Sequence, residues 1–196
     1  MKKIAIILLI FLFAAPSVVF ADAPLQTVEK RVNEVLSVLA EGSKDDKSIL
    51  EKKKDQIRAI SNEMFDYIEL SKRTLGRNWN KLSVEQRKEF VPLYRDLLEG
   101  VYMDRILAYK DEKVEYTNEK LFSNDKAEVQ TKVIAPSGDI PIFYRMIQKD
   151  NKWKVYDVII EGVSLIKNYR SQFNDILNKQ TPEELIKTLQ EKAKAS

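Results

Sequence analysis

Two carboxylates and one hydroxyl are the side chains in this sequence whose spacing could support catalysis. Asp157 and Glu161 are four residues apart in an expected strand, so both should point to the same face. Two carboxylates on one face could divide acid and base roles between them. Ser164 follows within Glu161-Gly162-Val163-Ser164-Leu165. A nucleophilic serine needs an activating base, and it needs a turn that holds its hydroxyl in place.

Neither feature is present in the sequence. There is no histidine in the chain, so no imidazole could activate the Ser164 hydroxyl. The segment also departs from the Gly-x-Ser-x-Gly pattern of a nucleophile elbow. The simpler interpretation makes Asp157 a hydrogen-bonded or ion-paired residue on a covered strand and Ser164 the N-cap of a helix. We therefore predict a protein that is not an enzyme.

Composition also excludes several cofactor classes. The chain has neither cysteine nor histidine, which removes Cys/His zinc sites and histidine-ligated haem. Its five glycines are scattered along the sequence and form no phosphate-binding loop. We expect no cofactor and no metal site.

The first 21 residues have the pattern of a secretory signal peptide. Lys2 and Lys3 precede an apolar run over residues 4–15, and Val19 and Ala21 occupy the −3 and −1 positions of a cut before Asp22. We predict cleavage there, a single domain over residues 22–196, and an exported protein. In a bacterium with two membranes, that location is the periplasm.

The charge balance argues against a nucleic-acid partner. The formal net charge of +3 includes Lys2 and Lys3, and the remaining chain is close to neutral. A nucleic-acid binder is expected to carry a strong basic excess. After the signal peptide no apolar run is long enough to span a membrane.

The spacing of apolar residues predicts helices at both ends of the chain. Residues 25–39 repeat at intervals of three and four, and a second helix begins near Ser48. Ser83 and Gln86 form a capping box that opens the longest helical pattern, which carries a wide aromatic stripe up to Ile106. The helical period returns over residues 165–177, and again after Thr181.

Between these helices the period changes to that of strands. Residues 114–121, 127–134, 140–148 and 152–161 alternate or run apolar, and short turns separate them. Short connections make the sheet an antiparallel meander. The last strand has no polar face, so we expect it to be central and covered on both sides. The fold class is therefore α+β.

A helix with an aromatic stripe can pack on a curved sheet in two ways. The helices can close completely onto the sheet, or they can leave a gap lined by aliphatic and aromatic groups that would hold a lipid. From the pattern of residues alone, both alternatives stay open, and binding is favoured over catalysis.

Two stretches resemble the MlaC family, also called the toluene-tolerance auxiliary family. Together they extend the similarity from about Leu25 to Leu189, although Pro92 is poorly suited to an uninterrupted helix. The first contains Phe65-Asp66, Leu75-Gly76-Arg77-Asn78-Trp79, Ser83-Val84-Glu85-Gln86-Arg87, Phe90, Tyr94-Arg95-Asp96-Leu97-Leu98 and Tyr102. The second contains Trp153-Lys154-Val155-Tyr156-Asp157-Val158, Glu161-Gly162-Val163-Ser164-Leu165 and Asn168-Tyr169-Arg170-Ser171-Gln172-Phe173.

The resemblance implies a soluble periplasmic phospholipid carrier. Such a protein would shuttle glycerophospholipid between an outer-membrane lipoprotein complex and an inner-membrane ABC transporter with an MCE-domain subunit, and so maintain outer-membrane lipid asymmetry. The implied fold is a curved antiparallel sheet of about four strands, packed with N- and C-terminal helices around an apolar lipid pocket. Acyl tails would lie inside, with the headgroup near the mouth.

Pattern and resemblance together indicate the residues that would contact lipid. Arg145 and Arg170 are candidates for the headgroup phosphate, against the alternative of ordinary ion pairs. Two other functions remain open: an exported interaction protein with a packed core and no ligand, and a lipid-modifying hydrolase. The candidate tail contacts are Leu97, Leu98, Val101, Tyr102, Ile106, Val129, Val133, Ile142, Tyr144, Val158, Ile160, Ile166, Tyr169 and Phe173.

Overall fold

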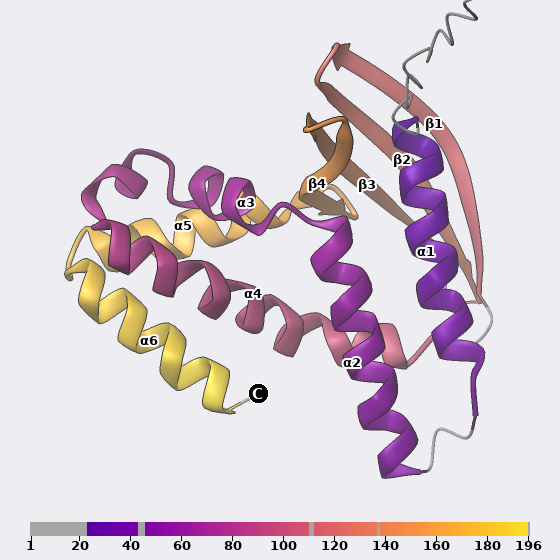
Figure 1. The fold of residues 1–196 in the computed structure, drawn as a ribbon, viewed down its shortest axis with the longest axis horizontal. Helices are drawn as coiled ribbons and strands as arrows, with labels where there is room; N and C mark the ends of the chain where they lie inside the picture. The colour runs from indigo at the N-terminus through magenta and orange to yellow at the C-terminus, as the bar shows by residue number, and fades with distance from the viewer. Residues whose placement is uncertain (1–22, 43–45, 110–111, 137, 196) are drawn as a thin grey trace, which may run out of the picture.

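The computed structural model describes residues 23–42, 46–109, 112–136 and 138–195. The predicted signal peptide and its cleavage site before Asp22 lie outside them. The elements are shown in Figure 1, and their order is α1 (Pro24–Ala40), α2 (Lys47–Met64), α3 (Tyr67–Leu75), the 3-10 helix η1 (Gly76–Lys81), α4 (Val84–Leu107), β1 (Lys113–Ser123), β2 (Lys126–Ala135), β3 (Gly138–Lys149), β4 (Lys152–Ile160), β5 (Val163–Ser164), α5 (Leu165–Leu177) and α6 (Pro182–Ala195).

The strands form one curved antiparallel sheet in the order β1-β2-β3-β4-β5. The meander of four strands is confirmed, and the two-residue β5 is an addition. β4 lies between β3 and β5, as predicted for a central strand, and β5 covers its outer edge only at Ile159 and Ile160. Its two faces are covered, as expected. A parallel bridge joins Phe65 to Val155, and the Asp66 N–H donates to the Val155 carbonyl at 2.8 Å.

The strand register sorts the side chains onto two faces. Val129, Tyr144 and Val158 are aligned across three strands. Thr131 and Ile142 are aligned in the next row, which continues to Ile160 on β4. Because residues directly opposite in antiparallel strands share a face, these rows make up one surface, called the apolar face below. Glu128, Arg145 and Asp157 form a row on the opposite, polar face.

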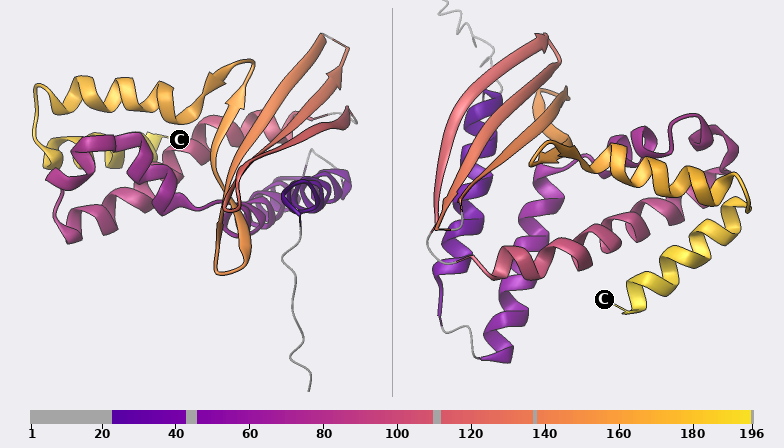
Figure 2. Two further views of the ribbon diagram at one scale, coloured as in Figure 1. Left: turned by 90° about the horizontal axis from the view of Figure 1, so that it is seen from above. Right: turned by 180° about the vertical axis from the view of Figure 1, so that it is seen from behind.

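Helix α1 lies over the apolar face. The Leu25 N–H donates to Glu119 Oε2 of β1 at 2.7 Å, and Val28 and Val32 pack into the main core. Figures 1 and 2 show α3, α5 and α6 gathered to one side of the sheet, with α4 running from among them toward α2. The sheet meets the helical end where β4 lies against α3 and α5.

A local sequence signal accounts for the start of α4. The Ser83 hydroxyl accepts the Gln86 N–H at 3.1 Å while the Gln86 side chain accepts the Ser83 N–H at 2.8 Å, which confirms the predicted capping box. The helix that follows, α4, continues through Pro92 as a single element.

Candidate functional site

The candidate residues on α4 differ in exposure along the helix. Leu97 and Leu98 are buried, Tyr102 and Ile106 are half-buried, and Val101 is 40% exposed. Ile106 packs against a second, smaller core formed by Val38, Leu39, Ile57 and Met103. The C-terminal half of α4 therefore has apolar surface that the rest of the protein does not cover.

The six candidates on the sheet all share the apolar face. Val129 and Val158 are buried within it, whereas Ile142, Tyr144 and Ile160 are half-buried at the edge of the main core. Val133, next along β2, is also half-buried. Sequence alternation could not say which strand face these residues occupy, and the register supplies that answer.

The candidates on α5 are enclosed. Ile166, Tyr169 and Phe173 are buried. The Phe173 ring lies 5.6 Å from Phe90 and 5.2 Å from Tyr94 by centroid, and Tyr94 lies 5.3 Å from Tyr169. Edge-to-face contacts of this kind fill a core efficiently. Phe90, Tyr94, Tyr169 and Phe173 are called the aromatic cluster below.

Sequence reasoning missed Tyr116 of β1. It lies opposite Thr131, so it extends the row of Ile142 and Ile160 across the apolar face. Its ring is half-buried, and its buried hydroxyl has no hydrogen-bond partner among the described residues. Burial raises the pKa of this phenol. The alternation of Val114 and Tyr116 with polar neighbours was the signal that could have found it. The half-buried group is defined as Tyr102, Tyr116, Ile142, Tyr144 and Ile160.

The two arginine candidates lie apart from the apolar face. Arg145 Nε is 3.2 Å from Glu128 Oε2, and its Nη1 is 3.8 Å from Asp157 Oδ2, all on the polar face. Arg170 is exposed on α5, where its Nη2 donates to the Arg73 carbonyl at 2.5 Å. In this structure both guanidiniums therefore contact protein groups of the polar face and of α3.

Ser164 and Asp157 form a helix cap. The Ser164 hydroxyl donates to Asp157 Oδ2 at 2.7 Å and accepts the Lys167 N–H at 3.1 Å, while the Ile166 N–H donates to Asp157 Oδ1 at 3.1 Å. Burial raises the pKa of the Asp157 carboxyl, and the hydrogen bonds from Ser164 and Ile166 oppose that shift. Glu161 is exposed in the turn before α5. The interpretation of Ser164 as an N-cap is confirmed.

Two clefts lie away from the candidate residues. One, of about 270 Å³, is lined by Leu39, Leu50, Lys53, Asp104, Leu107 and Ala108. Lys53 is buried there and its Nζ donates to the Leu39 carbonyl at 2.9 Å, so the ammonium satisfies the C-terminal end of α1. The other, of about 470 Å³, is lined by Phe65, Asp66, Tyr67, Ile68, Lys149, Asp150, Lys152 and Lys154.

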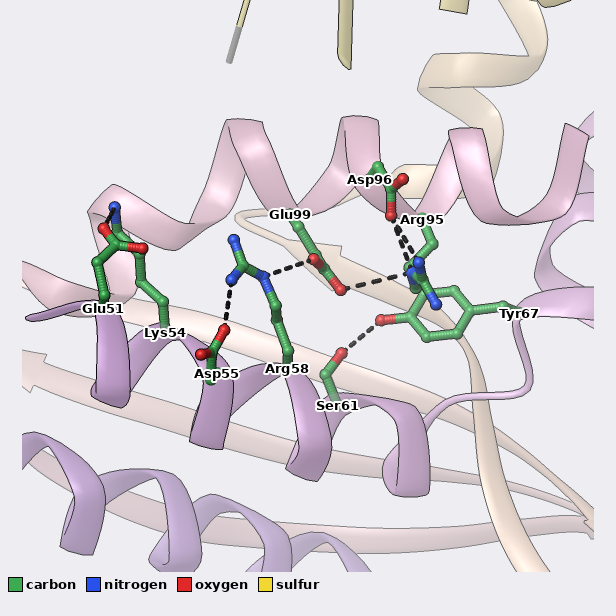
Figure 3. A network of polar contacts seen from close by, with 9 residues as sticks. All are labelled: Glu51, Lys54, Asp55, Arg58, Ser61, Tyr67, Arg95, Asp96 and Glu99. Atoms are coloured by element: carbon green, nitrogen blue, oxygen red, sulfur yellow. Dashed lines mark hydrogen bonds and ion pairs between the residues drawn. The ribbon is translucent and has the colours of Figure 1, made fainter. Parts of the chain in front are cut away.

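A polar network joins α2 to α4 (Figure 3). Arg58 Nε lies 3.3 Å from Glu99 Oε2 while its Nη1 is 2.8 Å from Asp55, and Arg95 contacts Glu99 at 3.7 Å. Burial raises the pKa of the Glu99 carboxyl, against the two arginines that lower it. Ser61 and Tyr67 are hydrogen-bonded beside this chain of charges. The network holds the middle of α4 next to α2.

Two features are missing from the described part of the chain. Across residues 23–42, 46–109, 112–136 and 138–195, no three acidic, histidine or cysteine side chains are grouped so that they could hold a metal ion. Within the same part of the chain, no helix combines the length and apolar character that a bilayer crossing requires.

The fold as a whole matches a solved structure. It resembles a phospholipid-binding protein from Ralstonia solanacearum, solved in complex with a phospholipid, with a TM-score of 0.78 and 23% sequence identity. The match covers 87% of this chain and 97% of that one. The class defined by the fold is thus an α+β protein with a curved sheet flanked by helices.

Sequence relatives define the family. The chain is 30% identical over 142 residues to the intermembrane phospholipid transport system binding protein MlaC of Haemophilus influenzae, covering 68% of this chain and 66% of that protein, just under two thirds of its length. It is 27% identical over 175 residues to the toluene tolerance protein ttg2D of Pseudomonas putida, covering 88% and 81%. The family model for MlaC protein matches residues 29–191. The chain belongs to the MlaC family.

Proposed function

We propose that this protein is a periplasmic phospholipid carrier, which holds the acyl tails of a glycerophospholipid and shuttles it between the two membranes. The observation that carries the proposal is membership of the MlaC family over residues 29–191. The half-buried group supports the proposal, because its apolar side chains are only partly covered by the core of this protein. The MlaC relative is named for phospholipid transport, and acyl tails would cover such side chains.

The tail contacts divide into two kinds. Tyr102, Ile142, Tyr144 and Ile160, joined by Tyr116, would touch the tails directly, and Val101, Ile106 and Val133 would extend that surface. The buried candidates would support it from behind: Leu97, Leu98, Val129, Val158, Ile166, Tyr169 and Phe173. Arg145 and Arg170 would reach a headgroup only after leaving their present partners, which makes them the weaker part of the site.

The energetics explain why a carrier is needed at all. Each methylene removed from water gains about 0.8 kcal/mol, so one tail of roughly 16 carbons gains on the order of 12 kcal/mol. Free lipid therefore crosses water at a negligible concentration. A carrier has to match the bilayer closely enough that the tails can leave again.

Partners would set the direction of transfer. The protein would receive and deliver lipid at an outer-membrane lipoprotein complex and an inner-membrane ABC transporter with an MCE-domain subunit. A carrier that has no energy source of its own only equilibrates its cargo, so net transport must be driven by the transporter. The phospholipid is cargo, and the protein neither converts it nor needs a cofactor to hold it.

The test is extraction and mass spectrometry of protein purified from periplasm without detergent. Near-stoichiometric diacyl phospholipid is expected. Val101→Trp should lower the lipid content without unfolding the protein, whereas Val84→Trp, at a similarly exposed helical position outside the candidate set, should leave it unchanged. A folded, lipid-free protein that also takes no lipid from vesicles would favour the interaction protein with a packed core.

Two further measurements separate the remaining alternatives. A hydrolase would release fatty acid from phospholipid vesicles and lose that activity in Ser164→Ala, and the carrier is expected to release none. N-terminal sequencing of the exported protein should begin at Asp22 if the signal peptide is cleaved as proposed.

A further inference from the structure

One end of the sheet gathers exposed apolar side chains together with lysines. Every residue from 120 to 126, at the end of the β1–β2 hairpin, is exposed. Leu121 is 60% and Phe122 is 51% exposed. Among the described residues, these two are the only exposed large apolar side chains that are adjacent in sequence. Burying such a pair within the fold would have been favourable, so their exposure indicates a surface that binds a partner.

Two lysines flank this pair, and the acidic residues next along the strands, Glu119 and Glu128, are engaged by the Leu25 N–H and by Arg145. Lys120 lies 5.3 Å from the Phe122 ring, and Lys126 begins the next strand directly after the turn. Both lysines are exposed, and within the described part of the chain neither lies within ion-pair distance of a carboxylate. Asp125 is the acidic residue of this turn, where it accepts a hydrogen bond from the Ser123 hydroxyl at 2.6 Å.

A second hairpin lies at the same end of the sheet. The Gln148 N–H donates to the Asp125 carbonyl at 2.9 Å, which holds the β3–β4 turn beside the β1–β2 turn. Lys152 begins β4 directly after that turn and is exposed, as is Asp150 on the turn. Lys149 is already paired with Asp66 at 2.6 Å. The cleft beside this turn adds Ile68, which is 61% exposed.

We propose that this end of the sheet docks on the surface of an anionic phospholipid bilayer. Lys120, Leu121, Phe122, Lys126 and Lys152 are called the tip patch. Phe122 and Leu121 would enter the interface between headgroups and acyl chains, and the lysine stems would lie along them with their ammonium groups at the phosphates. The attraction of lysines to anionic headgroups supplies the second part of the binding.

The shape of the tip patch favours a bilayer over a protein. A stable protein interface buries about 800 Å² on each partner, whereas the tip patch offers two adjacent apolar side chains on a protruding turn. Shallow insertion into a fluid interface needs no complementary surface, only apolar groups ringed by cations. Docking of this kind is separate from tail binding, because no residue of the tip patch belongs to the half-buried group.

The test is flotation of the lipid-loaded protein with two kinds of vesicle, one of phosphatidylcholine alone and one that also contains phosphatidylglycerol. The wild-type protein is expected to float with the anionic vesicles, less so as salt is added, and to stay off the neutral ones. The double variant L121S/F122S should bind about tenfold more weakly or worse. The variant K120Q/K126Q should lose about tenfold on anionic vesicles alone.

Controls keep the outcomes distinct. V84S removes an equally exposed apolar side chain on α4 and should bind vesicles like the wild type. Phospholipid content after purification should be unchanged in L121S/F122S, so that failure of docking is not confused with failure of the carrier function. Circular dichroism of each variant should match the wild type.

Two results would overturn the proposal. One is a failure in flotation. Either the wild-type protein stays off anionic vesicles at low salt, or the L121S/F122S variant floats with them as well as the wild type does. The other is an unchanged affinity for vesicles combined with weaker binding of L121S/F122S to the purified inner-membrane MCE-domain complex, which would make the tip patch a protein contact.

Discussion

The aromatic cluster and the half-buried group both contain large apolar and aromatic side chains, but they differ in how far those side chains are buried. In the cluster, Phe90, Tyr94 and Phe173 are at most 3% exposed and fill each other's contact surfaces. In the half-buried group, Tyr116, Ile142 and Tyr144 pack against the core and keep part of their surface exposed.

The aromatic cluster adds its full apolar surface to the stability of the fold, whereas the half-buried group leaves part of its apolar surface uncovered. Close-packed interiors gain both transfer free energy and dispersion contacts. A half-covered apolar side chain gains only part of each, so the apolar face beyond the aromatic cluster adds less to folding than its composition suggests. An acyl chain that completes those contacts would recover the remainder.

The largest expected effect separates the two regions directly. Phe173→Ala should destabilise the protein by about 3–5 kcal/mol, because it opens a cavity among the three remaining rings of the aromatic cluster. Tyr144→Ala, in lipid-free protein, should cost roughly half of that or less, since its ring is already partly uncovered. Urea unfolding of both variants measures the contrast. Equal losses would mean that the half-buried group is ordinary core.

Lipid removal should have the next largest effect. A ligand that binds only the folded state stabilises it by about 2.7 kcal/mol at a hundredfold excess over its dissociation constant. The lipid-loaded protein should therefore melt several degrees above the delipidated one, and Val101→Trp should narrow that gap. Calorimetry of matched loaded and stripped samples gives the answer. Identical melting curves would contradict the role proposed for the half-buried group.

The sequence predicted the fold in detail where local chemistry decides it. Capping at Ser83 and Ser164, the four long strands and the α+β class were all readable, because caps, turns and periodicity act over a few residues. The predicted central position of β4 holds only along part of the strand, because β5 pairs with two of its residues. Its apolar character reflects contacts with α2, α3 and α5, of which α2 and α3 are distant in sequence.

The candidate site was predictable only in part. The stripe on α4 and the alternating strands pointed to apolar residues, but local pattern cannot tell a side chain enclosed by other helices, such as Phe173, from one left half-covered, such as Ile142. The ion pairs of Arg145 with Glu128 and Asp157 depend on register across three strands. Such long-range placement requires the assembled sheet.

Ser164 offers a smaller effect that tests the link between the sheet and the aromatic cluster. Its hydroxyl caps the helix that carries Tyr169 and Phe173. Ser164→Ala should cost about 1 kcal/mol, with lipid content unchanged. Thermal unfolding and lipid extraction of the same preparation check both points. Loss of lipid without loss of stability would contradict a purely capping role, whereas Ser164→Thr should restore most of the stability.

The smallest effect at neutral pH, and the most specific to the half-buried group, concerns the phenol of Tyr144. Burial raises its pKa to about 12, while an exposed tyrosine in the unfolded chain titrates near 10. The folded state thus keeps a proton that the unfolded state releases, so stability should fall as the pH rises from about 10 to about 12. In Tyr144→Phe the free energy of unfolding should fall less steeply over that window and follow the wild type at lower pH.

The absorbance of tyrosinate reports the ionisation of the same phenol. Binding of acyl tails should move the ionisation of Tyr144 to still higher pH, because the ring loses its remaining contact with water. An ionisation that lipid does not shift would place the tails elsewhere than on the apolar face.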